Sequence, residues 1–123
     1  MEISHRIEND VCVIEIDGNI ALDGVKATKN YIRPFLSNEA LHAILINFEK
    51  VDIIDSTGIG FVVSVFQFLR ERNAFLILYN VNKKNQETFS MTRLDKFLNI
   101  AGTEGEAYKK LNQLKESSAS SPA

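Results

Sequence analysis

Residues 43–79 read AILINFEKVDIIDSTGIGFVVSVFQFLRERNAFLILY, and this stretch decides the fold. Its two ends, Ala43 to Phe48 and Ala74 to Tyr79, are nearly continuous apolar runs, which is typical of strands covered on both faces of a parallel sheet. Between them, Thr57 to Arg72 is long enough and periodic enough to form a helix. The stretch therefore predicts a right-handed βαβ unit.

The N-terminal segment predicts a pair of antiparallel strands. Apolar and polar residues alternate over residues 3–7, and an apolar run resumes over residues 11–16. Asn9 and Asp10 separate the two runs and predict a tight turn.

A first helix is expected after this hairpin, from Leu22 onward. Apolar residues then recur at helical spacing, and Asp23 is the expected N-cap. Pro34 is expected to break or kink the helix near its end.

The C-terminal third predicts two shorter helices, over residues 85–92 and 104–115, with a short strand near Asn99 and Ile100. The expected order is β-β-α-β-α-β-α-β-α, an α/β fold with a mixed sheet of four or five strands and about four helices. One domain is expected over residues 1–115. A disordered, Ser-rich tail is expected over residues 116–123, because SSASSPA has no apolar anchor.

Composition excludes several classes of partner. The net charge of −2 comes from 14 basic and 16 acidic residues that are interspersed, so no basic stripe is available for nucleic acid. No apolar run approaches the roughly 20 residues needed to cross a bilayer. The N-terminus lacks the pattern of a secretory signal. We therefore expect a cytoplasmic protein that binds neither nucleic acid nor membrane.

Metal and redox chemistry have little support in the sequence. Cys12 is the only cysteine and lies in an apolar strand pattern, so it is either a buried structural thiol or, less in keeping with that pattern, a redox group. His5 and His42 are far apart, with no clustered ligands. We expect no metal and no cofactor.

The stretch Val51 to Gly60, VDIIDSTGIG, joins a buried strand to a helix, and partner sites gather at such carboxyl ends of strands. Ser56 is expected to cap the helix. Gly58 and Gly60 would leave its first turn free of bulk. Two interpretations remain open: a stable helix start, or a phosphoacceptor serine at the positive end of the helix dipole.

This stretch also resembles a known signature. Residues 53–60, with Asp-Ser-Thr-Gly followed by an aliphatic residue and glycine, resemble the motif of STAS-domain anti-sigma-factor antagonists of bacteria. Residues 18–23, 75–80 and 89–98 resemble neighbouring parts of the same domain. The likeness covers about residues 1–115. The distance from Gly18 to Asp23 and the position of Pro34 depart from the family pattern.

The resemblance implies a partner-switching phosphoprotein. Ser56 would be phosphorylated by an anti-sigma factor that is an ATP-dependent serine kinase, and dephosphorylated by a PP2C-type phosphatase. The unphosphorylated form would bind the anti-sigma factor and release the sigma factor. A monomer or weak dimer is expected. The implied partner-binding residues are Asp23, Asp55, Ser56, Thr57, Gly58, Ile59, Gly60 and Phe61.

Two features of the expected surface each allow two interpretations. Phe61, Val65 and Phe68 widen the apolar stripe of the central helix, and they either pack against a neighbouring helix or form an exposed docking patch. Lys83 and Lys84 lie beside the Ser56 loop if adjacent parallel strands end together, where they either steer an acidic partner or only solvate a loop.

Each competing function requires chemical groups of its own. A serine nucleophile needs a base, which neither histidine supplies from its context. An Asp55 phosphoacceptor would need Mg²⁺ held by more carboxylates than Asp52 alone. The stronger alternative is a STAS scaffold or regulatory subunit with another target: a stress-signalling assembly, a secretion or biofilm regulator, or a lipid transporter.

Overall fold

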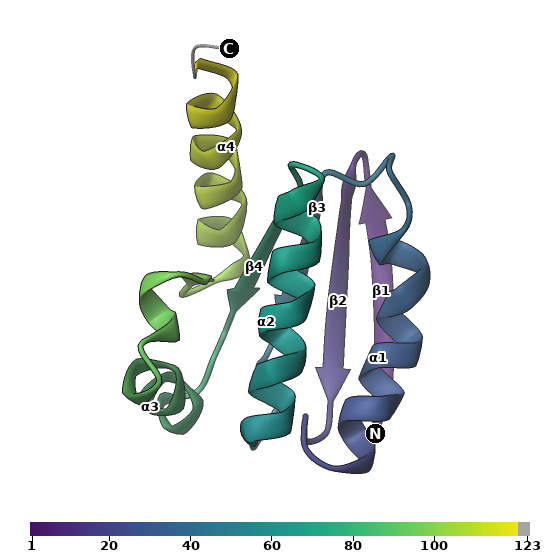
Figure 1. The fold of residues 1–123 in the computed structure, drawn as a ribbon, viewed down its shortest axis with the longest axis vertical. Coiled ribbons are helices and arrows are strands. Elements are labelled where there is room, and N and C mark those ends of the chain that lie inside the picture. Colours follow the sequence, from purple (N-terminus) through teal and green to yellow (C-terminus); the bar gives the residue numbers. More distant parts are fainter. Residues whose placement is uncertain (121–123) are drawn as a thin grey trace.

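The computed structural model describes residues 1–120, with side chains up to Ser117. These residues form five strands, four α-helices and one short 3-10 helix in the expected order. Figure 1 shows their arrangement. The bounds are β1 Glu2–Glu8, β2 Val11–Asp17, α1 Asp23–Leu36, β3 Ala43–Asn47, α2 Ser56–Glu71, β4 Phe75–Tyr79, α3 Lys83–Met91, η1 Leu94–Lys96, β5 Asn99–Ala101 and α4 Glu104–Ser120.

The five strands form one mixed sheet in the order β1-β2-β3-β4-β5. β1 is antiparallel to β2, and the hairpin closes at the pair Glu8 and Val11, with Asn9 in the turn at a φ of 56°. β2, β3, β4 and β5 are mutually parallel. The predicted fold class, hairpin and βαβ unit are confirmed.

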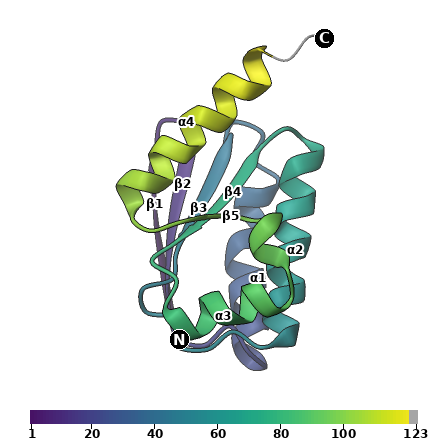
Figure 2. The same cartoon turned by 90° about the vertical axis from the view of Figure 1, so that its left-hand side faces the viewer.

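Helices cover both faces of the sheet, as Figure 2 shows, with α1 and α2 on one side and α4 on the other. Cys12, Ile14 and Ile16 of β2 pack into the larger core beneath α1 and α2. Val11 and Val13 belong instead to the smaller core that includes Ala107 and Leu111 of α4. This double cover explains why the central strands are continuous apolar runs and not alternating ones.

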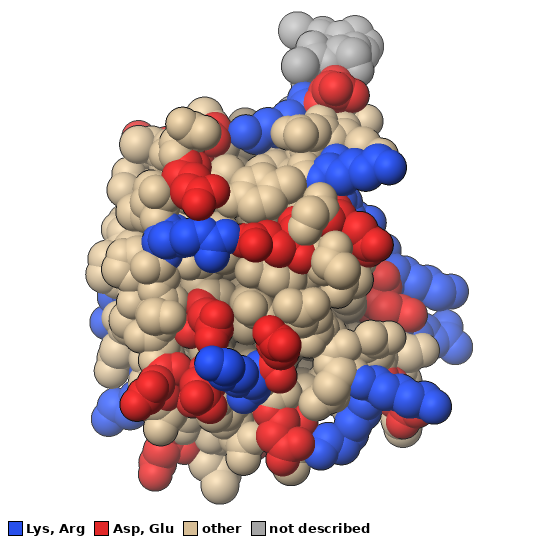
Figure 3. Space-filling model, turned by 180° about the vertical axis from the view of Figure 1, so that it is seen from behind, with Lys and Arg blue, Asp and Glu red and all other residues tan. Residues whose placement is uncertain are grey.

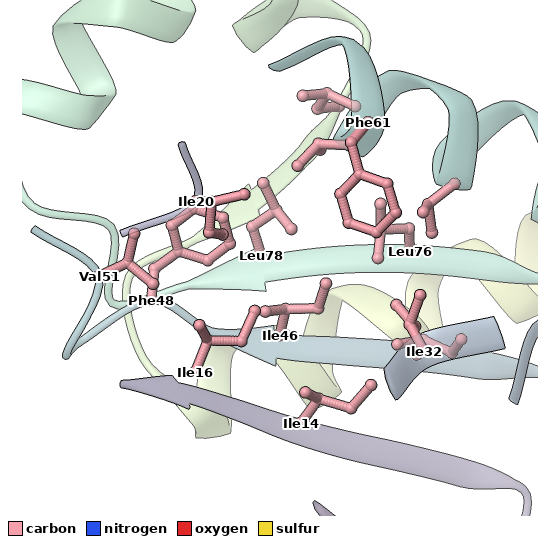
Figure 4. Close-up of a cluster of buried hydrophobic side chains, with 14 of the residues drawn as sticks. Ile14, Ile16, Ile20, Ile32, Ile46, Phe48, Val51, Phe61, Leu76 and Leu78 are labelled. Carbon is pink, nitrogen blue, oxygen red and sulfur yellow. The ribbon is translucent and has the colours of Figure 1, made fainter. Parts of the chain in front are cut away.

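The larger core extends to the carboxyl end of the sheet (Figure 4). There Phe48, which follows β3, and Phe89 of α3 are both fully buried, and their ring centroids are 6.4 Å apart. Ile20 and Val51 are buried in the same cluster. The segments that enter and leave this end of the sheet are therefore fixed to the core by large side chains.

Cys12 is the buried structural thiol that its apolar surroundings predicted, since none of its surface is exposed. Burial raises the pKa of the thiol from 9.0 to about 11. The reactive thiolate is thereby disfavoured.

The C-terminal helix is longer than expected. α4 continues to Ser120, so residues 116–120 are helical and the predicted tail boundary after residue 115 is wrong. Ala107 and Leu111 anchor the helix in the core, and Lys115 Nζ lies 3.1 Å from Asp10 Oδ2 in the β1–β2 turn. Each residue added to an anchored helix forms one more backbone hydrogen bond, so the polar residues after Lys115 can continue the helix. Residues 121–123 of the predicted tail lie outside the described part of the chain.

Pro34 does not interrupt α1, which ends two residues later at Leu36. Pro34 has no N–H to donate to the carbonyl four residues earlier, and its ring crowds that carbonyl, but little helix lies beyond this turn for a kink to displace.

The surface behind the view of Figure 1 carries both signs of charge. Lys and Arg side chains alternate there with Asp and Glu and do not gather into one patch (Figure 3). Within the described residues, no helix is long and apolar enough to span a bilayer, and no group of three or more His, Cys, Asp or Glu could hold a metal ion.

Candidate functional site

The candidate site lies where β3 ends and the chain turns into α2. The turn is tied to the neighbouring strand, because Phe48 N–H donates to Tyr79 O at 2.9 Å. Val51 N–H then donates to Phe48 O at 2.9 Å. Val51 and Ile54 are buried, whereas Asp52 and Ile53 are exposed. The loop therefore has an anchored underside and a solvent-facing outside.

The underside is held by a buried asparagine of α3. Asn85 is 1% exposed, and its Nδ2 donates to Val51 O and to Asp52 O at 3.2 Å each. Its Oδ1 accepts from Ile54 N–H at 3.3 Å. One carboxamide thus satisfies three backbone groups of the loop.

A second asparagine of the same segment supports this arrangement. Asn82 Nδ2 donates to Val51 O at 3.2 Å and to Asp52 O at 3.1 Å. Its Oδ1 caps α3 by accepting from Asn85 N–H at 2.8 Å. The cap therefore fixes the position of the residue that makes the buried contacts.

The other edge of the loop is bound to the segment that precedes α1. Asn19 Oδ1 accepts from Ile53 N–H at 3.1 Å, and Ile20 N–H donates to Ile53 O at 3.0 Å. Ile20 and Ile54 form an isolated parallel bridge. Asp55 N–H donates to Ile20 O at 3.4 Å. The starts of α1 and α2 are thereby brought side by side.

Asp55, and not Ser56, caps α2. Asp55 Oδ1 accepts from Gly58 N–H at 2.8 Å, and Asp55 O accepts from Ile59 N–H at 2.9 Å. Ser56 is the first helical residue and is exposed. Aspartate and serine are comparable caps, and the extended backbone of Asp55 places its carboxylate to accept first. The prediction of Ser56 as the cap is wrong by one residue.

The two glycines of α2 differ in their surroundings. A Cβ added to Gly58 would lie 2.0 Å from Ile20 O and 2.7 Å from Ile54 Cγ1, whereas one added to Gly60 would meet no described atom within 4 Å beyond its chain neighbours and its own helix backbone. Gly58 therefore permits the close approach of the α1 and α2 entry segments. Gly60 leaves open space on the exposed side of the first turns.

The structure brings together the predicted residues from Asp55 to Gly60 in the first turns of α2. Asp23 is the first residue of α1 and not its N-cap, a position that Leu22 occupies. Phe61 is 8% exposed, and its ring points into the core in Figure 4, so its predicted place on a partner-binding surface is wrong.

The wide apolar stripe of α2 is partly buried and partly exposed. Phe61 and Val65 are buried, on a helix that contacts α1, whereas Phe68 is 47% exposed. A broad stripe is needed because α2 packs against both the sheet and a neighbouring helix.

Lys84, at the start of α3, is near the loop as expected, since its Nζ lies 3.2 Å from Asp52 Oδ1. Lys83 is exposed on the same turn. Both side chains of the Lys84–Asp52 pair are more than half exposed, so the pair contributes little to stability.

Both histidines have partners away from the candidate site. His5 Nδ1 lies 2.5 Å from the Tyr31 hydroxyl of α1. His42 precedes β3 and lies 3.5 Å from Asp10, at the opposite end of the strand from Ser56. The arrangement around Ser56 therefore presents a hydroxyl and backbone N–H groups, with a carboxylate as the nearest charged group in the sequence.

Three comparisons relate the chain to known proteins. The family model described as STAS domain matches residues 2–107. The anti-sigma-B factor antagonist of Listeria monocytogenes is 28% identical over 106 residues, which are 86% of this chain and 91% of that protein.

Two solved folds are also similar. A Thermotoga maritima protein, provisionally described as an anti-sigma factor antagonist, has a TM-score of 0.83 at 22% identity, covering 89% of this chain and 94% of that one. The antagonist SpoIIAA in its unphosphorylated form has a TM-score of 0.75 at 23% identity, covering 91% and 97%. A structure of Bacillus SpoIIAA in the phosphorylated form has a TM-score of 0.69, also at 23% identity, covering 89% and 99%.

Replacing the buried asparagine tests how the loop is held. Asn85→Ala should lower the free energy of unfolding by about 1–3 kcal/mol, because it leaves the buried N–H of Ile54 without its acceptor and takes one of two donors from Val51 O. Urea denaturation measures the change. Asn112→Ala, at an exposed position of α4, is the control and should change it by less than about 0.5 kcal/mol. Equal stability of the two variants would contradict this role of Asn85.

The two glycines give a matched pair of substitutions. Gly58→Ala should destabilise the protein by about 1–3 kcal/mol, because the added methyl group collides with Ile20 O. Gly60→Ala should stabilise it by roughly 0.5–1 kcal/mol, since the position is open and helical. Opposite shifts of the urea midpoint are expected, and shifts of the same sign would count against the close approach at Gly58.

Proposed function

We propose that this chain, which belongs to the STAS domain family, is an anti-sigma factor antagonist of a partner-switching pathway, with Ser56 as its phosphoacceptor. The observation that carries the proposal is the exposed Ser56 hydroxyl at the first position of α2, directly after an anchored loop. In the unphosphorylated form this surface would bind an anti-sigma factor that is also a serine kinase. The sigma factor would then be released.

Access to the hydroxyl supports this role. Ser56 and Thr57 are both exposed, and the space beside Gly60 is open. Because the loop behind Ser56 is held by Asn85 and Asn82, the hydroxyl is presented at a fixed position. A kinase active site could therefore approach without rearranging the chain.

The fold should tolerate a phosphate at this position. The first N–H groups of a helix have no intrahelical acceptor, and the helix dipole attracts an anion by about 0.3–1 kcal/mol when the site is exposed. The adjacent Asp55 carboxylate opposes this attraction. Because the two effects are of opposite sign, phosphorylation is expected to change the surface more than the stability.

The change at the surface is a gain of negative charge. A phosphoserine adds about −1.5 to −2 charges, next to the carboxylate of Asp55. Like charges brought together at an interface cost several kcal/mol. Since each 1.4 kcal/mol is a factor of ten, a loss of about a hundredfold or more in affinity for the kinase is expected.

This role is regulatory and not catalytic. In the proposal ATP is bound by the kinase, this chain needs no cofactor, and a PP2C-type phosphatase restores the free hydroxyl. The switch operates in the cytoplasm, where the kinase finds ATP and the sigma factor, and the antagonist acts as a monomer or weak dimer.

Phosphorylation can be tested by intact-mass measurement. The purified chain, incubated with ATP and each anti-sigma factor kinase of its source organism, should gain one phosphate group with the cognate kinase. Ser56→Ala should gain none, whereas Thr57→Ala, which removes the neighbouring exposed hydroxyl, should still gain one. A phosphate on Ser56→Ala would place the acceptor elsewhere. No gain with any kinase would favour the scaffold or transporter-subunit alternative.

A further inference from the structure

Leu22 is an exposed leucine in a backbone conformation that does not suit it. Its side chain is 83% exposed, and its φ of 51° and ψ of −124° are those of the second residue of a type II′ turn. Gly24 N–H donates to Ala21 O at 2.9 Å and closes that turn. Glycine is the residue that this position favours, so leucine strains the backbone here.

Leucine is also a poor choice for the second role of this position. Leu22 is the N-cap of α1, and no side-chain hydrogen bond caps the helix. Serine, threonine, aspartate or asparagine would supply one. A residue that is unfavourable both as a cap and at positive φ, and that buries almost none of its surface, is not explained by folding.

The place of Leu22 suggests what it does. Ile20 and Ile54 form a parallel bridge, and Leu22 and Ser56 each lie two residues beyond it. Ile53, in the loop between β3 and α2, also has a large apolar side chain that faces solvent, at 42% exposed. Its carbonyl accepts a hydrogen bond from Ile20 N–H. Leu22 and Ile53 therefore lie on two neighbouring segments at the candidate phosphorylation site.

Two acidic residues adjoin the segments that carry Leu22 and Ile53. Asp23 follows Leu22, and Asp55 precedes Ser56. No salt bridge to either carboxylate is formed within the described part of the chain. Asp55 is already engaged as the cap of α2. The carboxylate of Asp23, beside two exposed aliphatic side chains, is complementary to an apolar pocket with basic groups at its rim.

We propose that Leu22 is the apolar anchor by which this chain docks on the anti-sigma factor kinase, inserting into an apolar pocket whose rim carries Lys or Arg. The inference rests on the function proposed above and adds to it a specific contact. Ile53 extends the anchor, and Asp23 faces the basic rim, whereas Asp55 caps α2 and lies with Ser56 outside that rim, where an added phosphate meets negative charge. The turn strain is retained because it holds the leucine side chain outward, next to the hydroxyl that the kinase modifies.

The test is to replace Leu22 and measure both folding and binding. Leu22→Gly removes the side chain and suits the turn, so its Tm should be equal to that of the unmodified chain or higher. Its affinity for the kinase that phosphorylates Ser56, measured by calorimetry, should fall about 10- to 100-fold, as expected for losing one buried leucine contact. Leu22→Met should keep the affinity within about threefold.

Met91→Ala is the matched control, because Met91 is 85% exposed at the end of α3. It should not change the affinity. Unchanged affinity of Leu22→Gly, with normal phosphorylation of Ser56, would overturn the anchor and leave the proposed function intact. A large fall in Tm would show that Leu22 has a structural role and would also overturn it. If the unmodified chain neither binds nor is phosphorylated by any of the kinases, both proposals fail.

Discussion

The three hydrogen bonds of the Asn85 carboxamide are the constraint on which the site depends. They give the buried N–H of Ile54 its acceptor and, together with Asn82, satisfy the carbonyls of Val51 and Asp52. With Ile54 held, the bridge to Ile20 can form, and that bridge brings the entry segment of α1 against Gly58. The position of the first turn of α2, and so of Ser56, follows from these contacts.

A site built in this way suits a switch that acts through its surface. The core beneath it contains Phe48 (Figure 4) and Phe89, both fully buried, so the loop has little freedom to rearrange. The groups that a partner would meet are the Ser56 hydroxyl, the carboxylate of Asp55 and the aliphatic side chain of Leu22. Adding a phosphate to the first of these changes charge at a fixed point, and the fold beneath need not move for binding to be lost.

Much of the fold could be predicted from the sequence, because hydrophobic periodicity records which faces are buried. The runs at Ala43 to Phe48 and Ala74 to Tyr79 identified doubly covered strands. Local signals were less decisive: Asp55 and Ser56 are equally good caps, and only the backbone angles distinguish them. The extension of α4 depends on its anchoring to Asp10 across 105 residues of sequence. Asn85 could not be recognised, since a buried asparagine in Asn-Lys-Lys-Asn resembles a solvated loop. The outward position of Leu22 required the turn geometry.

The central claim is that phosphorylation of Ser56 excludes the partner by charge at a surface that is otherwise unchanged. The most direct test compares the affinities of the unmodified and the Ser56-phosphorylated chain for the kinase at increasing salt concentration. Charge exclusion predicts a difference of about a hundredfold or more at low salt. That difference should narrow as salt screens the repulsion. A difference that is absent, or that does not change with salt, would contradict the account.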